Sequence, residues 1–143
     1  MGTRSTTLIK TNEIPILCMY RQHDGYPSEH GNDLFKFLSE IELVNSMTAG
    51  MDTGTHAYGS GCLAAQMIMR FKVEHGLGKI YIVGFDDFGG ESFNYIIDIK
   101  TDRRTAIESV ARLRIINSCN DSLFDGDLQD FGRFCSTNNN DGY

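Results

Sequence analysis

The sequence has no run of apolar residues long enough to cross a membrane. A membrane-spanning helix needs about 20 consecutive apolar residues, and polar residues interrupt every apolar run before that length. Positive charge is also scarce, because 13 lysines and arginines stand against 19 aspartates and glutamates, for a net charge of −6. We therefore expect neither a membrane protein nor one that binds duplex nucleic acid nonspecifically. A small anion can still bind where a few arginines and backbone N–H groups converge.

Signatures of metal binding and nucleophilic catalysis are missing too. The cysteines at positions 18, 62, 119 and 135 form no Cys-x-x-Cys and no matched Cys/His spacing, so we expect free, mostly buried thiols and no metal site. There is no Gly-x-Ser-x-Gly motif. The first residues lead directly into a strand pattern, without a signal peptide. We therefore expect a soluble, intracellular protein that uses no cofactor and is not an enzyme.

The periodicity of the apolar residues indicates an α+β fold. Strand-forming residues fill five segments, at 4–10, 15–21, 80–83, 93–100 and 112–116. Helical spacing of apolar residues marks three others, at 31–41, 59–74 and 128–135. The order is roughly ββααβββα with mostly hairpin-length links, which favours an antiparallel β-sheet with helices packed on one face. We place a single domain at residues 1–136 and a disordered polar tail at 137–143.

Local signals mark the expected ends of the helices. Asn32 or Asp33 can cap the first helix, and Gly76 follows the second one as a C-terminal glycine. Asp125 stands before the last helix as an N-cap. Residues 44–58 are small, polar and glycine-dotted, which is typical of a loop.

The stretch MYRQHDGYPSEHG at residues 19–31 is dense in reactive side chains. Its histidines and acids resemble a metal-binding or acid–base set, but their spacing fits no metal motif. Gly25-Tyr26-Pro27 is strong turn chemistry, so we interpret the stretch as a strand end, a turn and a helix entry. Arg21 and Tyr26 remain candidates for contact with a ligand or a neighbouring subunit.

A second candidate is the glycine-rich entry to the helix at residue 59. Gly59 and Gly61 allow close backbone approach, and the free N–H groups of a helix start attract phosphate. Ser60 and Thr55 add hydroxyl donors, and His56 lies between them. The stretch lacks the Lys of a P-loop, so hydrolysis of a nucleoside triphosphate is not expected. Both a phosphate site and a plain glycine-rich helix entry fit this pattern.

The third candidate combines an aromatic loop with two arginines. Phe85 lies on the glycine-flanked loop 84–92, where an exposed ring can stack on a nucleobase for about 1–3 kcal/mol. Arg112 and Arg114 alternate with apolar residues, so both should project from one face of the sheet, and arginine binds phosphate in bidentate fashion. Alternatively, the two are solvated edge-strand arginines neutralised by nearby aspartates. The aspartates considered are Asp86, Asp87 and Asp98.

Four motifs together resemble a known family: MGTRS at the start, YRQHDGYPSEHG, GSGCLAAQ and LFDG. They are similar to those of small bacterial and phage proteins whose best-understood branch is the phage Thoeris anti-defence proteins of the first type. The resemblance covers most of residues 1–130, and its first two motifs are the most specific ones.

This resemblance implies a protein that sequesters an immune signal without degrading it. The signal is glycocyclic ADP-ribose made by Thoeris TIR enzymes, and the branch also binds cyclic trinucleotides of CBASS defence at separate sites. The resemblance further implies dimers joined into a hexamer and a location in the cytoplasm of the infected or lysogenic bacterial host. It places the ADP-ribose-type ligand on Phe85, Asn94 and Arg112, with Arg114 beside them. The stretch Thr55 to Gly61 becomes the candidate trinucleotide site.

Two other classes of function remain open at this stage. One is a hydrolase of cyclic nucleotides that uses His23, His30 or His56 as a general acid or base. The other is a structural or host-factor-binding protein, in which the apparent ligand sites are incidental.

Overall fold

The computed structural model describes residues 2–46 and 54–137. Its strands are β1 Ser5–Thr11, β2 Ile14–Arg21, β3 Glu42–Val44, β4 His56–Tyr58, β5 Ile80–Val83, β6 Phe93–Thr101, β7 Glu108–Ile116 and β8 Ser122–Gly126. Its helices are α1 Asn32–Glu40, α2 Gly59–His75 and α3 Leu128–Thr137, together with a π-helical turn at Pro27–Gly31 and a 3-10 turn at Phe85–Asp87. In the described part of the chain no helix is long and apolar enough to cross a membrane.

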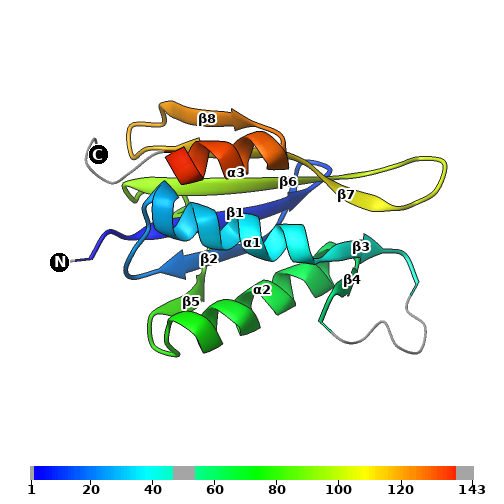
Figure 1. The fold of residues 1–143 in the computed structure, drawn as a ribbon, viewed down its shortest axis with the longest axis horizontal. Coiled ribbons are helices and arrows are strands. Elements are labelled where there is room, and N and C mark those ends of the chain that lie inside the picture. Colours follow the sequence, from blue (N-terminus) through cyan, green and yellow to red (C-terminus); the bar gives the residue numbers. More distant parts are fainter. Residues whose placement is uncertain (1, 47–53, 138–143) are drawn as a thin grey trace.

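Six strands form one sheet in the order β5-β2-β1-β6-β7-β8. Every neighbouring pair is antiparallel except β1 and β6, which run parallel. The helices lie on one face of this sheet (Figure 1). The α+β prediction is therefore confirmed, with one parallel pair inside a mostly antiparallel sheet. The short β3 and β4 pair with each other, and they and β8 are additions to the predicted order.

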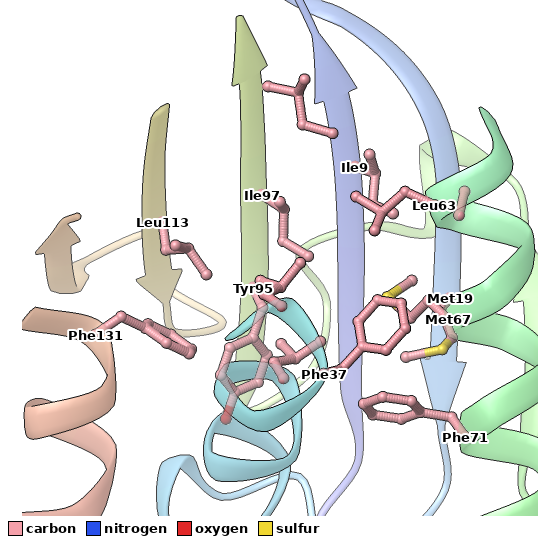
Figure 2. Packing of buried hydrophobic residues seen from close by; sticks show 14 of the residues in the cluster. Ile9, Met19, Phe37, Leu63, Met67, Phe71, Tyr95, Ile97, Leu113 and Phe131 are labelled. Carbon is pink, nitrogen blue, oxygen red and sulfur yellow. The ribbon is translucent and has the colours of Figure 1, made fainter. Parts of the chain in front are cut away.

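The core lies between the sheet and the three helices (Figure 2). Alternate strand residues point to the same face of a sheet, so β1, β2, β6 and β7 each send every second side chain toward the helices. The best buried side chains, each at most 1% exposed, include Ile9, Met19, Tyr95, Ile97 and Leu113 from the strands and Phe37, Leu63, Met67, Phe71 and Phe131 from the helices. Within the described residues, no α-helix covers the opposite face (Figure 1), and we call it the helix-free face.

The strands β5 and β6 are consecutive in sequence but not neighbours in the sheet. β2 and β1 lie between them, so residues 84–92 must cross the sheet, and we call this segment the crossover loop. Its Gly89 N–H points to Thr6 Oγ1 at 3.4 Å, and its Glu91 N–H donates to Asn94 Oδ1 at 3.3 Å. The crossover loop therefore lies against the helix-free face.

The predicted ends of the helices are partly correct. Gly76 follows α2 with φ +110°, as expected of a C-terminal glycine. Asn32 is the first residue of α1 rather than its cap, and its side chain donates to Ser28 O at 2.8 Å. Asp127 caps α3, since its Oδ1 accepts from Asp130 N–H at 2.8 Å. Asp125 was the wrong choice because strand pairing with β7 extends as far as Gly126.

Two segments that were predicted to be irregular include residues of strands or helices. The predicted loop at residues 44–58 includes the last residue of β3 and all of β4, and residues 47–53 lie outside the described residues. Thr137 is the last residue of α3, so its assignment to the predicted disordered tail was wrong. Residues 138–143 are also outside the described part. All four cysteines are free thiols, and Cys18 and Cys135 are buried.

Candidate functional site

Arg112 and Arg114 project from the helix-free face of β7. Leu113 between them is 1% exposed and belongs to the core, so its two neighbours must point the other way. On β6 they stand opposite Asp98 and Ile96, respectively. The prediction that both arginines share one sheet face is therefore confirmed.

Arg112 makes an exposed bidentate ion pair with Asp125. Its Nε lies 2.5 Å from Asp125 Oδ1, and its second nitrogen, an Nη, contacts Oδ2 of the same carboxylate. The two side chains are 49% and 42% exposed. This hydrogen bonding lowers the pKa of Asp125 below its ordinary value and raises the pKa of Arg112. The guanidinium thus uses two nitrogens, Nε and an Nη, to hold an anion at the surface.

Arg114 makes a more deeply placed pair with Asp98. Its Nε and an Nη lie 3.1 Å and 3.0 Å from Asp98 Oδ2, and the two side chains are 25% and 5% exposed. The other carboxylate oxygen, Oδ1, is buried without a hydrogen-bond partner among the described residues. Because burial makes such a pair costly to separate, Arg114 is less available to a ligand than Arg112.

Asn94 is fully buried and its amide is engaged inside the protein. Its Oδ1 accepts from Thr6 Oγ1 at 2.5 Å, and its Nδ2 donates to Glu91 O at 2.7 Å. A weaker contact of 3.4 Å joins Nδ2 to Ile116 O. These bonds tie the crossover loop to β1 and β7. The structure therefore gives Asn94 a positioning role for that loop, and it exposes no surface of this side chain.

Phe85 is 49% exposed on the 3-10 turn of the crossover loop. Its turn contacts β2, and three strand spacings separate β2 from β7. At about 4.8 Å per spacing, the two strands are roughly 14 Å apart. A small ring would have to span that separation to contact both Phe85 and Arg112 of one chain.

The crossover loop also shields the sheet beneath it. Cys18 on β2 is fully buried, and burial, with a smaller contribution from the nearby Asp87 carboxylate, raises the pKa of its thiol to about 11. This cysteine is therefore a protonated packing residue.

The glycine-rich helix entry already holds a carboxylate. Ser60 N–H donates to Glu108 Oε1 at 3.2 Å, and a Cβ added to Gly59, whose φ is +78°, would lie 3.0 Å from that oxygen. Negative charge is favoured at a helix N-terminus, and Glu108 supplies it from 48 residues away in the chain. A phosphate at this position would have to displace Glu108.

The remaining residues of the glycine-rich candidate are engaged with close neighbours. Thr55 Oγ1 lies 3.0 Å from His56 Nδ1, and His56 Nε2 lies 3.4 Å from a Glu42 carboxylate oxygen. Gly61 is exposed, with open space where a Cβ would stand. The structure thus brings Thr55, His56, Gly59, Ser60 and Gly61 together at the start of α2, beside the acids Glu42 and Glu108.

The MYRQHDGYPSEHG stretch folds into a buried polar network. Arg21, which is 4% exposed, donates from Nη1 to Asp33 Oδ2 at 2.7 Å and from Nε to His23 O at 2.7 Å. Nη1 also lies 3.1 Å from His30 Nδ1, while His30 Nε2 lies 2.7 Å from Thr7 Oγ1. Both ring nitrogens of His30 are therefore in use. Burial, followed by the charge of Arg21, holds the pKa of His30 well below its usual value.

This network identifies Arg21 as a structural residue, whereas Tyr26 takes no part in the network. Tyr26 lies on the other side of the turn and lines a cavity of about 430 Å³.

Among residues 2–46 and 54–137, no group of three or more His, Cys, Asp or Glu side chains is arranged to hold a metal ion. The sequence pattern showed the reactive residues but not their pairing, because Asp33 and Thr7 lie outside the stretch.

Two partners of the candidate residues were not expected in these roles from the sequence. Asp125 was assigned to a helix cap, and Glu108 is distant in the chain from the helix start that it contacts. Of the aspartates proposed to neutralise the arginines, Asp98 does so by hydrogen bonding to Arg114. Comparisons of the chain with family models, with curated proteins and with solved structures find no match.

Proposed function

We propose that this protein binds and sequesters a small cyclic nucleotide immune signal, glycocyclic ADP-ribose in the first place, without cleaving it. The observation that carries the proposal is the exposed Arg112–Asp125 pair, in which an arginine fork already holds a planar anion at the surface. A phosphate can replace a carboxylate on such a fork. The motif resemblance described above supplies the ligand class.

The separation of Phe85 from Arg112 supports a site shared between two copies of the chain. One copy would supply the aromatic ring for the base, and the other would supply the arginine for the phosphate. We therefore propose a homodimer, which three-fold assembly would extend to a hexamer, with cyclic trinucleotides of CBASS defence bound near the start of α2. The place of action is the cytoplasm of an infected or lysogenic bacterium.

The engaged ring nitrogens of two candidate histidines, His30 and His56, fit sequestration better than hydrolysis. His30 is buried with both nitrogens engaged, and His56 is shared between Thr55 and Glu42. A general base needs a nitrogen free to reach the substrate. His23, the third histidine considered for hydrolysis, lines a cavity with Asp24 and His75, so the test of the proposal includes a search for cleaved ligand.

The proposal is tested by titrating the purified protein with glycocyclic ADP-ribose in a calorimeter. After binding, the protein is heat-denatured and the released ligand is analysed by mass spectrometry, where the intact ring is expected. Arg112→Ala should weaken binding at least tenfold, since it removes a charge-assisted bidentate contact.

The matched control is Arg133→Ala. Arg133 makes a comparable exposed ion pair with Asp130 on α3, away from the helix-free face, so its loss should leave binding unchanged. Recovery of a cleaved ligand, or equal binding by Arg112→Ala and wild type, would contradict the proposal.

A further inference from the structure

A cavity of about 430 Å³ opens between the Gly-Tyr-Pro turn, the start of β6 and the turn that joins β7 to β8. Its apolar lining consists of Tyr26 and Leu123, which are partly exposed, and of Phe93, which is only 2% exposed and supports Tyr26 from the core. The rings of Tyr26 and Phe93 have centroids 5.8 Å apart and planes inclined by 56°. This volume falls in the range of about 300–1,000 Å³ that is typical of small-molecule sites.

The polar part of the cavity consists mainly of hydroxyl groups. Thr3, Ser92, Ser118 and Tyr26 each contribute one, and none of these four hydroxyls is hydrogen-bonded to another described residue. A hydroxyl can both donate and accept, so it can match a donor or an acceptor on a ligand. Among the described residues that line the cavity, none carries a formal charge.

The walls of the cavity are fixed before any ligand arrives. Gly25 N–H donates to Thr3 O at 2.9 Å, and the Tyr95 hydroxyl donates to Gly25 O at 2.6 Å. A Cβ on Gly25 would lie 2.9 Å from the Arg4 backbone, so the close approach of the turn to the strand entry requires glycine. This contact fixes the position of the adjacent Tyr26.

The opposite wall is fixed by Asn117. Its Oδ1 accepts from Cys119 N–H at 3.0 Å and from Asp121 N–H at 2.9 Å. Its side chain is therefore committed to the β7–β8 turn, and it holds Ser118 in place. A preformed site loses less entropy on binding than a mobile one.

We infer that this cavity binds an uncharged sugar ring, either a free monosaccharide or the ribose of a nucleoside. The C–H faces of such a ring pack against Tyr26 and Leu123, while its hydroxyls pair with those of Thr3, Ser92 and Ser118. A phosphate has no cation among the lining residues. The inference does not rest on the proposed function, because Phe85, Asn94 and Arg112 do not line the cavity, and Tyr26 is the one candidate ligand contact that does.

The test uses the full chain and saturation-transfer NMR, followed by calorimetry, with D-ribose, adenosine and AMP as separate probes. Binding of ribose identifies the free sugar, and binding of adenosine alone identifies the nucleoside. AMP should bind no more tightly than adenosine. The double variant Ser92→Ala/Ser118→Ala should weaken binding at least tenfold, because it removes two hydrogen bonds.

Two control variants test whether the sugar binds in this cavity. Ser39→Ala/Ser109→Ala, which changes two exposed serines outside the cavity, should bind like wild type. Arg112→Ala should also keep full binding of the sugar probe, whatever happens to cyclic nucleotide binding. The inference is overturned if neither ribose nor adenosine binds, if the Ser92/Ser118 double variant binds like wild type, or if AMP binds more than tenfold tighter than adenosine.

Discussion

Two arginine–aspartate pairs in this protein have similar hydrogen bonding but opposite surroundings. Arg21 and Asp33 meet at 2.7 Å beneath the helices, where the arginine side chain is 5% exposed. Arg112 and Asp125 meet on the helix-free face, where both side chains are nearly half exposed. The buried arginine also contacts His30 and the His23 carbonyl, whereas Arg112 has Asp125 as its hydrogen-bond partner.

The difference shows that burial, rather than residue type, decides which arginine is available to a ligand. Removing one partner of a buried pair leaves an uncompensated charge and costs several kcal/mol. An exposed pair is worth about 0–1 kcal/mol, so another anion can exchange into it. The MYRQHDGYPSEHG stretch therefore stabilises the fold, and the strand RLRII carries the site that we propose for ligand exchange.

The largest expected effect is that of Arg21→Met on stability. The substitution keeps most of the side-chain volume but leaves Asp33 and His30 without their shared donor. We expect the free energy of unfolding to fall by about 3 kcal/mol, the lower end for a broken buried pair, because Asp33 remains partly solvated. The loss is measured as a lower midpoint urea concentration in equilibrium denaturation. Arg112→Met is the matched variant and should lose less than about 1 kcal/mol. Equal losses of stability in the two variants would show that the buried and the exposed pair do not differ in their contribution to folding.

Asp98→Ala should have an intermediate effect, because the Arg114–Asp98 pair is intermediate in burial. The variant leaves the mostly buried Arg114 guanidinium without its carboxylate, which is expected to cost about 1–3 kcal/mol. The comparison variant is Asp125→Ala, in which the exposed Arg112 is simply resolvated. If the two aspartates proved equivalent in urea denaturation, the ranking of the two pairs by burial would be wrong.

The pH dependence of stability should come from the buried network. The folded-state pKa of His30 is lowered by burial and by Arg21, so below about pH 6.5 the unfolded chain binds a proton that the folded protein does not. Stability is then lost as pH falls toward the lowered pKa, by at most about 1.4 kcal/mol per unit. Burial also lowers the pKa of His75, which acts in the same direction.

Urea denaturation at a series of pH values between 7.5 and 5 checks this expectation. His30→Gln cannot titrate and should flatten the dependence, leaving the His75 part. His23→Gln is the control, and it should retain the wild-type slope. A stability that rises as the pH falls through this window would contradict the assignment.

The smallest expected effect is that of Asp125→Asn, and it should appear in binding rather than in folding. The substitution removes the internal competitor for Arg112, so affinity for glycocyclic ADP-ribose should rise by up to about fivefold, the equivalent of about 1 kcal/mol. Stability should change by less than that amount. Asp130→Asn on α3 is the matched control. Weaker binding by Asp125→Asn would show that this aspartate assists the ligand instead of competing with it.

Much of the fold was predictable because its signals are local. The alternation in residues 93–100 and the helical spacing after residue 59 identified β6 and α2 almost to their ends. The pairing of strands was not predictable in this way. Nothing in the sequence near β5 shows that its chain crosses two strands before β6 begins. Asp125 was misassigned because Leu-Phe-Asp-Gly fits a helix entry as well as a short strand.

The candidate site was predictable only in part. The alternation of Arg112 and Arg114 with Leu113 correctly placed both on one face. The ion partner of Arg112 depends on β8, which was not predicted, and the burial of Asn94 depends on the path of the crossover loop. These contacts join residues that are 13 and 88 positions apart in sequence.

The sequence by itself determined the class of fold, the net negative charge and the set of candidate anion-binding residues, since these depend on composition and on the spacing of nearby residues. The tertiary structure decided which of those residues are exposed. It buried Arg21 and Asn94, left Arg112 at the surface and lined a cavity with hydroxyl-bearing residues from four segments of the chain. The physical reason is that solvation sets the cost of exchanging an ionic partner, and only the packed chain determines solvation.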